Sequence, residues 1–258
     1  MTAALGTPAS PAVTVTDTAS GSILYRVREF RTQTIPGITD SSDFLARDTA
    51  GNLNYTTIKI DPLGGDDVVQ VDDPATIGVP DGTSVLVPLA INVGSGNDSV
   101  DLSRVAAVLT ATVGTIITGG EGNDLLIGTP YADRIYGGAG NDTLYGGAGK
   151  DVFVFNTGTG RSNVDAVTDF VVTDDSLWLD NAVFKALGGK GSLARPQKLG
   201  SDAFAIATRA QDREDRIVYD KKSGKLYYDQ DGTGSKAQVQ IATLTKGLKM
   251  TAADFFVI

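Results

Sequence analysis

Apolar and polar positions recur with a nine-residue period in the middle of the chain. Residues 119–154 read GGEGNDLLI, GTPYADRIY, GGAGNDTLY and GGAGKDVFV, which are four units without a gap. In every unit glycine stands first, aspartate stands sixth and an apolar residue stands eighth. We therefore predict that each unit is a glycine-rich turn followed by a very short strand with one side chain in a core. The four apolar residues are Leu126, Ile135, Leu144 and Phe153.

The period also predicts how the units stack. Two units make one coil of a parallel β-helix, so units 18 residues apart lie directly above one another. Asp142 then lies above Asp124, and Asp151 lies above Asp133. The fold class that follows is all-β. It is a right-handed parallel β-roll, or β-helix, with an irregular β extension before it and a β cap after it.

The predicted turns are rich in the ligands that calcium prefers. Glycine lets a turn adopt φ > 0 and point several carbonyl oxygens inward, and aspartates from neighbouring levels add carboxylate oxygens. Calcium accepts about 6–8 oxygen ligands in flexible geometry, whereas magnesium requires a tighter octahedron. We therefore predict Ca²⁺ as the bound ion. The predicted ligands within the repeats are Gly120, Gly122, Asp124, Asp133, Gly138, Gly140, Asp142, Gly147, Gly149 and Asp151.

The units resemble the calcium-binding repeat G-G-x-G-x-D-x-U-x of RTX proteins, also called the hemolysin-type repeat. Three of the four units fit this pattern fully. The second unit departs from it at its second and fourth places, Thr129 and Tyr131, although Asp133 and Ile135 stay in register. The alternative is an ordinary run of Gly-Asn-Asp turns between strands. Turn-residue bias alone, however, would not hold a nine-residue phase over four units.

The chain before the repeats divides into two predicted parts. Residues 1–22 are rich in Ala, Thr, Ser and Pro, and we expect a linker or a disordered start there. Residues 23–118 form an irregular β region. Two looser motifs, GGDDVV and GSGNDSV, predict irregular rungs of the same helix and make Asp98 a calcium-ligand candidate and Asp67 a weaker one. Isolated turns in a small β-sandwich are the alternative. The expected β runs lie at residues 24–30, 55–60, 68–71, 85–93 and 105–117.

After the repeats, residues 155–258 are predicted to cap the open end of the stack. Two β runs flank a KSG turn at residues 222–224 and predict a hairpin. One helical turn is expected over residues 180–187, with Asp180 as its N-cap and Gly188 as its stop.

The segment YYDQDGTG at residues 227–234 contains two further candidate features. Asp229, Asp231 and Gly232 look like the start of a calcium loop, but an EF-hand needs glutamate at the twelfth place, where this chain has Gln240. An EF-hand is therefore excluded, and a plain turn needs no metal. The two tyrosines could form a sugar-binding platform, but such residues more often pack on the two faces of a hairpin.

From residue 119 onward, the chain is similar to the C-terminal domain of the serralysin family of secreted metalloproteases. The shared features are the repeats, FVFNTGTG, VDAVTDF, the YYDQDGTG hairpin and the terminal ADFFVI. The resemblance implies a calcium-binding and secretion module, and it makes Asp169, together with Asp165, a ligand candidate at the end of the stack. A solvated strand face is the alternative for these two residues. Residues 1–118 do not resemble the protease domain.

The same resemblance implies a partner for the C-terminus. Asp254 and the four apolar residues after it, ending at Ile258, resemble the terminal signal of type I secreted proteases. A type I secretion transporter is therefore the expected partner. The N-terminus lacks the pattern of a secretory signal peptide, which fits the same route. A final β-strand docked on the cap is the alternative.

Composition excludes several classes of function. A net charge of −9 and a pI near 4.5 argue against a nucleic-acid partner and against an anionic membrane surface. The chain has no cysteine and no histidine, which removes thiolate metal sites, zinc-protease motifs and histidine-based triads. It contains no run of about 18 apolar residues, so no membrane span is predicted.

Together these features predict a secreted, extracellular calcium-binding protein or module that is not an enzyme. We expect it to fold on binding calcium after type I export, because clustered carboxylates repel one another without the ion. Two alternatives stay open. In the first, residues 23–118 bind a surface or a glycan, as in an adhesin or matrix protein. In the second, Asp, Arg, Lys and Tyr side chains of that region form the active site of a lyase or epimerase.

Overall fold

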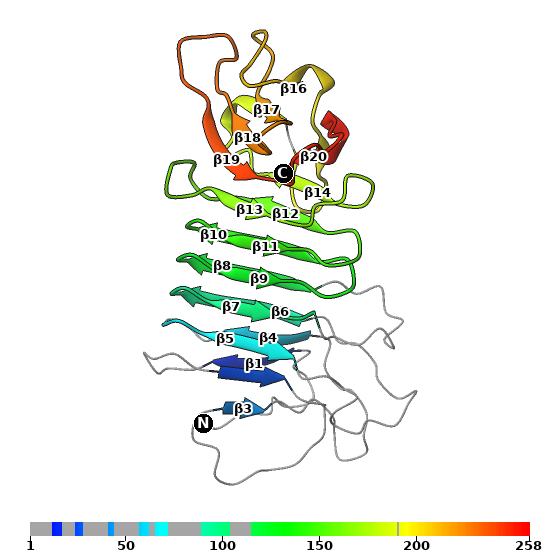
Figure 1. Ribbon diagram of the computed structural model, residues 1–258. Helices are drawn as coiled ribbons and strands as arrows, with labels where there is room; N and C mark the ends of the chain where they lie inside the picture. Colours follow the sequence, from blue (N-terminus) through cyan, green and yellow to red (C-terminus); the bar gives the residue numbers. More distant parts are fainter. Residues whose placement is uncertain are drawn as a thin grey trace.

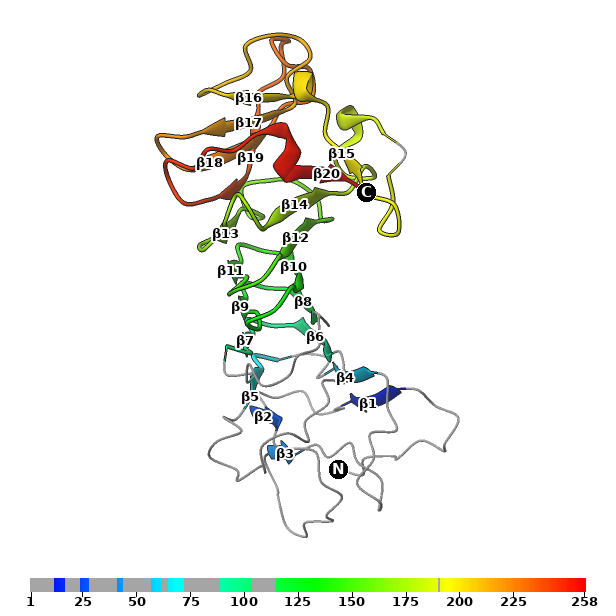
Figure 2. The same cartoon turned by 90° about the vertical axis from the view of Figure 1, so that its right-hand side faces the viewer.

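The short strands predicted from the nine-residue period are present and stack into an elongated molecule (Figure 1). The computed structural model describes residues 12–16, 24–27, 41–43, 57–61, 65–71, 89–103, 115–189 and 191–258. The strands lie across the long axis, and the C-terminal region forms a wider β cap at one end (Figure 1). Turned by 90°, the roll shows two sheets that lie opposite each other (Figure 2).

Sheet 1 contains nine strands among the described residues. Neighbouring strands in it run parallel, except for the last pair, which is antiparallel. In spatial order the strands are β1 (Ala12–Thr16), β4 (Thr57–Asp61), β6 (Leu89–Ser95), β8 (Ile116–Glu121), β10 (Arg134–Ala139), β12 (Val152–Phe155), β14 (Ser176–Leu179), β20 (Phe255–Val257) and β15 (Gln197–Lys198).

Sheet 2, on the opposite face, contains eleven strands in the described part of the chain. Its strands are parallel except around β18, which runs antiparallel to both of its neighbours. In spatial order they are β16 (Phe204–Ile206), β17 (Ile217–Asp220), β18 (Lys225–Tyr228), β19 (Val239–Thr243), β13 (Asp165–Val167), β11 (Thr143–Tyr145), β9 (Leu125–Ile127), β7 (Ser99–Asp101), β5 (Val68–Val71), β2 (Leu24–Val27) and β3 (Ser41–Asp43).

Each coil of the repeats gives one strand to each sheet, and like positions pair in register. Leu126 of β9 lies beside Leu144 of β11, and Ile135 of β10 lies beside Phe153 of β12. All four side chains are at most 1 % exposed, as predicted for the eighth place of each unit. The predicted parallel β-roll is confirmed.

The looser motifs before the repeats belong to the same stack. β5 pairs in parallel with β7, and β7 pairs in parallel with β9. Equivalent residues in these levels are 31 and then 26 positions apart, instead of 18. The prediction of irregular rungs is therefore confirmed for these strands, and isolated turns of a β-sandwich do not describe them.

Two N-terminal strands lie where the sequence did not indicate them. β1 falls within the segment expected to be a linker, and it pairs in parallel with β4. β3 pairs in parallel with β2. The remainder of residues 1–22 and parts of four predicted runs lie outside the described residues. Those parts are residues 28–30, 55–56, 85–88 and 105–114.

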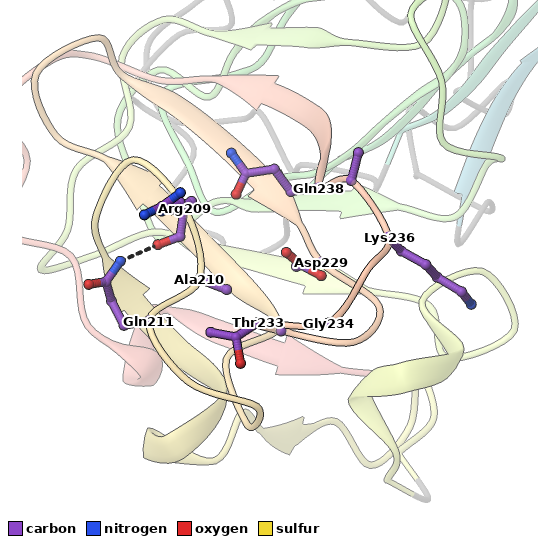
Figure 3. Close-up of a pocket in the computed structure, with 10 residues that line it drawn as sticks. Arg209, Ala210, Gln211, Asp229, Thr233, Gly234, Lys236 and Gln238 are labelled. Carbon is purple, nitrogen blue, oxygen red and sulfur yellow. Dashed lines mark hydrogen bonds between the residues drawn. The ribbon is translucent and has the colours of Figure 1, made fainter.

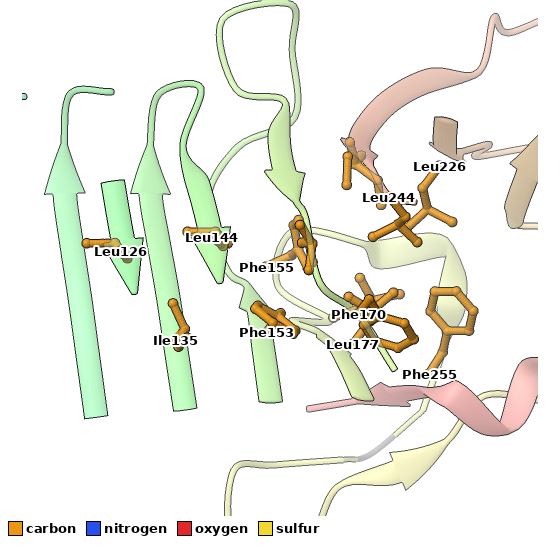
Figure 4. Packing of buried hydrophobic residues seen from close by; sticks show 14 of the residues in the cluster. Leu126, Ile135, Leu144, Phe153, Phe155, Phe170, Leu177, Leu226, Leu244 and Phe255 are labelled. Atoms are coloured by element: carbon orange, nitrogen blue, oxygen red, sulfur yellow. The ribbon is translucent and has the colours of Figure 1, made fainter. Parts of the chain in front are cut away.

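Single aliphatic side chains form the interior of the roll, and aromatic side chains fill its junction with the cap (Figure 4). The rings of Phe153 and Phe170 lie 6.2 Å apart between centroids, and those of Phe204 and Phe255 lie 5.2 Å apart. One buried side chain per nine residues recovers less free energy than ordering the unit costs. The repeats therefore need a source of stability other than their core.

The predicted hairpin of the cap is confirmed. β17 and β18 are antiparallel, and the turn between them ends at Gly224, whose φ is 80°. Tyr228 on this hairpin is 2 % exposed, its ring meets Phe184 edge to face, and its hydroxyl accepts a hydrogen bond from Ala186 N at 2.9 Å. The idea of an exposed tyrosine pair for sugar binding is therefore wrong, because the segment after Asp180 covers one of the two tyrosines.

The helical elements of the described residues are short 3-10 turns. The helix η2 (Lys185–Leu187) ends at Gly188, as predicted, but its N-cap is Phe184, so the predicted start with Asp180 as N-cap is wrong. Asp180 Oδ1 instead accepts from Ala182 N at 2.8 Å in the turn before the helix. Two more, η3 (Ser201–Ala203) and η4 (Ala252–Asp254), were not predicted. None of the helices in the described ranges is long and apolar enough to span a membrane.

The C-terminal segment is built into sheet 1. β20 lies between β14 and β15, with Phe255 at 0 % and Val257 at 3 % exposure. Asp254 closes a capping box with Thr251, whose backbone N–H donates to Asp254 Oδ2 at 2.6 Å. The final strand predicted as an alternative is therefore present, and it completes the cap.

Candidate metal centre

The turns of the roll stack along two edges. In both edges, the backbone N–H of one level donates to the aspartate Oδ1 of the next level. Edge 1 is defined by the ladder of Asp67, Asp98, Asp124, Asp142 and Asp165. Edge 2 is defined by the ladder of Thr115, Asp133, Asp151 and Asp175.

Glycines allow the turns of edge 1 to approach one another closely. Gly122 has a φ of 131° and Gly140 a φ of 144°, a region that L side chains rarely adopt. A Cβ built on Gly122 would lie 1.5 Å from Gly96 O, and one on Gly140 would lie 1.7 Å from Gly122 O. Carbonyl oxygens of one turn therefore face the next turn. The other predicted ligand glycines also have positive φ, namely Gly120, Gly138, Gly147 and Gly149.

The carboxylates of edge 1 are buried one above another. Asp67 N donates to Asp98 Oδ1 at 2.7 Å, Asp98 N to Asp124 Oδ1 at 2.8 Å, and Asp124 N to Asp142 Oδ1 at 2.9 Å. These four aspartates are at most 2 % exposed. The structure thus brings Asp98 into the same row as Asp124 and Asp142, as the sequence predicted.

The second carboxylate oxygen of three edge 1 aspartates has no donor in the described part of the chain. Oδ2 of Asp98, Asp124 and Asp142 is buried and has no hydrogen-bond partner among the described residues, and the same holds for Asp151 on edge 2. Burial raises the pKa of Asp98 to about 6, of Asp124 to about 7 and of Asp151 to about 8. An unpaired buried carboxylate is costly unless a cation neutralises it.

A second ladder runs beside the aspartates of edge 1. Asn123 N donates to Asn97 Oδ1 at 2.9 Å, and Asn141 N donates to Asn123 Oδ1 at 2.8 Å. These asparagines occupy the fifth place of their turns. On edge 2 the same place is taken by Ala132 and Lys150. Edge 1 is therefore the more regular of the two.

Asp169, a ligand candidate from the family resemblance, lies beside the fourth turn rather than in either ladder. Its Oδ1 accepts from Gly146 N and its Oδ2 from Gly147 N, each at 2.9 Å. Both oxygens thus hold the backbone at the entrance of the turn that ends at Asp151.

At the end nearest the cap, the two ladders finish with Asp165 and Asp175, which lie outside the nine-residue repeats. Asp165 Oδ1 accepts from Asp142 N at 3.2 Å, 23 positions away, and Asp175 Oδ1 accepts from Asp151 N at 3.0 Å, 24 positions away. The sequence favoured Asp165 only through resemblance, and it did not indicate Asp175. A search for aspartates that follow a turn, without fixed spacing, would have found both.

The donors of edge 1 fit a calcium ion. No group of three or more His, Cys, Asp or Glu side chains in the described ranges converges as a metal site. The available metal ligands are instead one carboxylate per level and the carbonyl oxygens of the glycine turns. This mixed set of oxygen ligands suits calcium. Asp98, Asp124 and Asp142 are the side chains that would hold the ion. A bound calcium would supply positive charge beside their unpaired oxygens.

Asp229 and the residues after Asp231 line one side of a separate pocket of about 560 Å³ in the cap, and residues 209–211 line another (Figure 3). Asp229 is 4 % exposed, and its Oδ1 accepts from Asp231 N at 3.2 Å. A Cβ on Gly232 would lie 2.3 Å from Asp212 O, so glycine is required for this close approach. The predicted turn is present, and it connects β18 to β19, which pair antiparallel.

Acid is expected to stabilise the metal-free roll. The pKa values of Asp98, Asp124 and Asp151 are raised from the ordinary 3.8, mainly by burial, to between about 6 and 8. A raised carboxyl pKa gives stability that is present below about pH 4 and is lost as the pH rises through 6 to 8. In a calcium chelator, circular dichroism should therefore show more β-structure at pH 5 than at pH 8. An equal β signal at both pH values would contradict this.

The comparisons with known proteins agree with this geometry. Residues 118–153 match the family model described as the RTX calcium-binding nonapeptide repeat, in four copies. A comparison with curated proteins gives no match. The matched residues run from β8 to β12 and include the turns that end at Asp124, Asp133, Asp142 and Asp151. Residues 118–153 of this chain are thus RTX calcium-binding nonapeptide repeats.

Proposed function

We propose that this chain is a secreted calcium-binding protein whose β-roll folds when calcium binds outside the cell, after type I export. The row of buried aspartates on edge 1 carries the proposal. Asp98, Asp124 and Asp142 each hold one carboxylate oxygen that no described group donates to. Without a cation these charges are desolvated and repel their neighbours in the row. The role proposed for the roll is structural rather than catalytic.

Calcium can supply the stability that the core of the roll lacks. A site filled at ten times its dissociation constant adds about 1.4 kcal/mol. Several coupled sites therefore add a large part of the roughly 5–15 kcal/mol that stabilises an ordinary domain. Calcium is scarce inside cells and abundant outside them, so mass action would leave the exported chain unfolded until it emerges.

The position of the C-terminus supports the same order of events. Phe255, Val257 and Ile258 are at most 8 % exposed, and Ile258 N donates to Leu179 O at 3.0 Å. A transporter could contact these side chains only before the cap folds. Together with the resemblance to type I secreted proteases, this supports export of an unfolded chain with its signal in residues 254–258.

Export is expected to fail when residues 254–258 are deleted. The chain would be co-expressed with a type I transporter, and the amounts in the medium and in the lysate would be compared. Leu226→Ala is the control, because it damages a fully buried position of the cap and leaves the C-terminus intact. The truncated protein should stay in the lysate while Leu226→Ala reaches the medium. Equal export of the truncated and intact proteins would reject the C-terminal signal.

A further inference from the structure

We infer that the second repeat turn, residues 128–133, is a metal-free rung in which Thr129 takes the place of calcium. The inference rests on the proposed calcium dependence of the other turns. It concerns edge 2 and revises the sequence prediction that Asp133 is a calcium ligand.

Asp133 receives hydrogen bonds on both carboxylate oxygens. Thr129 N donates to Oδ2 at 2.5 Å, and Thr129 Oγ1 lies 2.8 Å from the same oxygen. Thr115 N donates to Oδ1 at 2.7 Å. Hydrogen bonds to a carboxylate are stronger than those between neutral groups, and several of them stabilise a buried anion. Asp133 therefore has protein donors on both carboxylate oxygens, and these hydrogen bonds offset part of the effect of its burial.

The aspartates of edge 1 lack this compensation. Asp124 and Asp142 each accept one backbone hydrogen bond from the level below on Oδ1, and their Oδ2 atoms have no donor among the described residues. All three of these carboxylates are at most 2 % exposed, so burial does not distinguish Asp133 from the other two. The difference lies in the residue four positions before Asp133, where Thr129 replaces glycine.

The second turn also lacks the glycine geometry of edge 1. In the third unit the second and fourth places are Gly138 and Gly140, with φ of 108° and 144°. In the second unit they are Thr129, which is 3 % exposed, and Tyr131, whose backbone N–H donates to Thr129 Oγ1 at 3.1 Å. The threonine hydroxyl thus lies inside the turn, between the backbone and the carboxylate. The hydroxyl therefore takes up the space beside Asp133 Oδ2 and donates a hydrogen bond to that oxygen.

The consequence is that the repeat turns differ in their dependence on metal, and the difference falls within edge 2, where Asp151 has an Oδ2 without a described donor and Asp133 does not. Edge 1 is expected to hold calcium along its row of aspartates. Asp133 has the same ladder bonds to the levels of Thr115 and Asp151, and in addition Thr129 donates to its Oδ2, where the two edge 1 aspartates compared above have no described donor. The repeats would therefore bind fewer calcium ions than the four matching units suggest.

The number of bound ions tests this inference. Equilibrium dialysis against calcium, followed by atomic absorption, would count the ions per chain in the wild type, Asp133→Asn, Asp142→Asn and Thr129→Val. We expect Asp142→Asn to lose at least one ion and Asp133→Asn to lose none. Thr129→Val should keep the wild-type number of ions but melt at a lower temperature, because only the hydroxyl donor is lost.

The outcomes separate this inference from the proposed function. Loss of an ion in Asp133→Asn or in Thr129→Val would overturn the metal-free rung. If Asp133→Asn does not fold, the ion count of Thr129→Val decides alone. A wild-type chain that binds no calcium would instead reject the proposed function, because then no turn of either edge is a metal site.

Discussion

Gly122→Ala is expected to lower the free energy of unfolding by about 3 kcal/mol or more in saturating calcium. Gly122 has a φ of 131°, and its Cβ would lie 1.5 Å from the carbonyl oxygen of Gly96. The atom in the way belongs to the backbone of the adjacent turn, so no side-chain rotation can relieve the clash. The turns ending at Asp98 and Asp124 would have to separate. Urea unfolding followed by circular dichroism measures the loss.

Gly158→Ala is the matched control for this substitution. A Cβ at Gly158 meets no atom within 4 Å, so the same chemical change should alter stability by no more than about 0.5 kcal/mol. Equal stability of Gly122→Ala and Gly158→Ala would show that the turns of edge 1 do not need to approach as closely as the structure places them.

Phe255→Ala is expected to lower the free energy of unfolding by about 3–5 kcal/mol, the range for deleting a fully buried aromatic side chain. Phe255 is 0 % exposed, and its ring lies 5.2 Å from that of Phe204 between centroids. Its strand, β20, joins β14 to β15, so a cavity here weakens the contact between sheet 1 and the rest of the cap. Urea unfolding in excess calcium would measure the effect.

The next residue provides the comparison. Phe256 lies on the other face of the same strand, half-buried, with its ring 6.1 Å from that of Trp178. Phe256→Ala should lower the free energy of unfolding by about 1 kcal/mol. If the two substitutions proved equally harmful, the burial pattern assigned to β20 would be wrong.

The structure of the repeats could be predicted because residues close together in the sequence determine it. The glycine, aspartate and apolar positions of each unit specify a turn, a ligand and a core residue within nine positions. The 18-residue register of Leu126 with Leu144 then follows from the period alone. Asp98 was also predictable, since its turn keeps the glycine–aspartate spacing even though the coil that follows is longer.

Features that depend on distant parts of the chain were not predictable from the pattern. The strand β20 enters sheet 1 beside β14, although about 75 residues separate them. Burial of Tyr228 depends on Phe184, which comes from a different segment. The ladder residue Asp175 breaks the nine-residue phase. The departure of the second unit was visible in the sequence, but its meaning required seeing the Thr129 hydroxyl beside Asp133.

The two edges also explain why a fold with so small a core can be stable. With one apolar side chain per unit at the eighth place, each level buries little apolar surface. The charge compensation of the buried aspartates therefore decides whether the levels hold together. On edge 1 we propose that calcium supplies the compensating charge and is thereby part of the folded structure.

Circular dichroism of the purified chain, recorded in calcium and in excess chelator at pH 8, tests this claim most directly. We expect the chelator to remove most of the β signal of the roll, and added calcium to restore it in one cooperative transition. Asp124→Asn should move that transition to about tenfold higher calcium, whereas Glu121→Gln, an exposed carboxylate of the same turn, should leave it in place. A β spectrum that does not change in chelator would contradict the account.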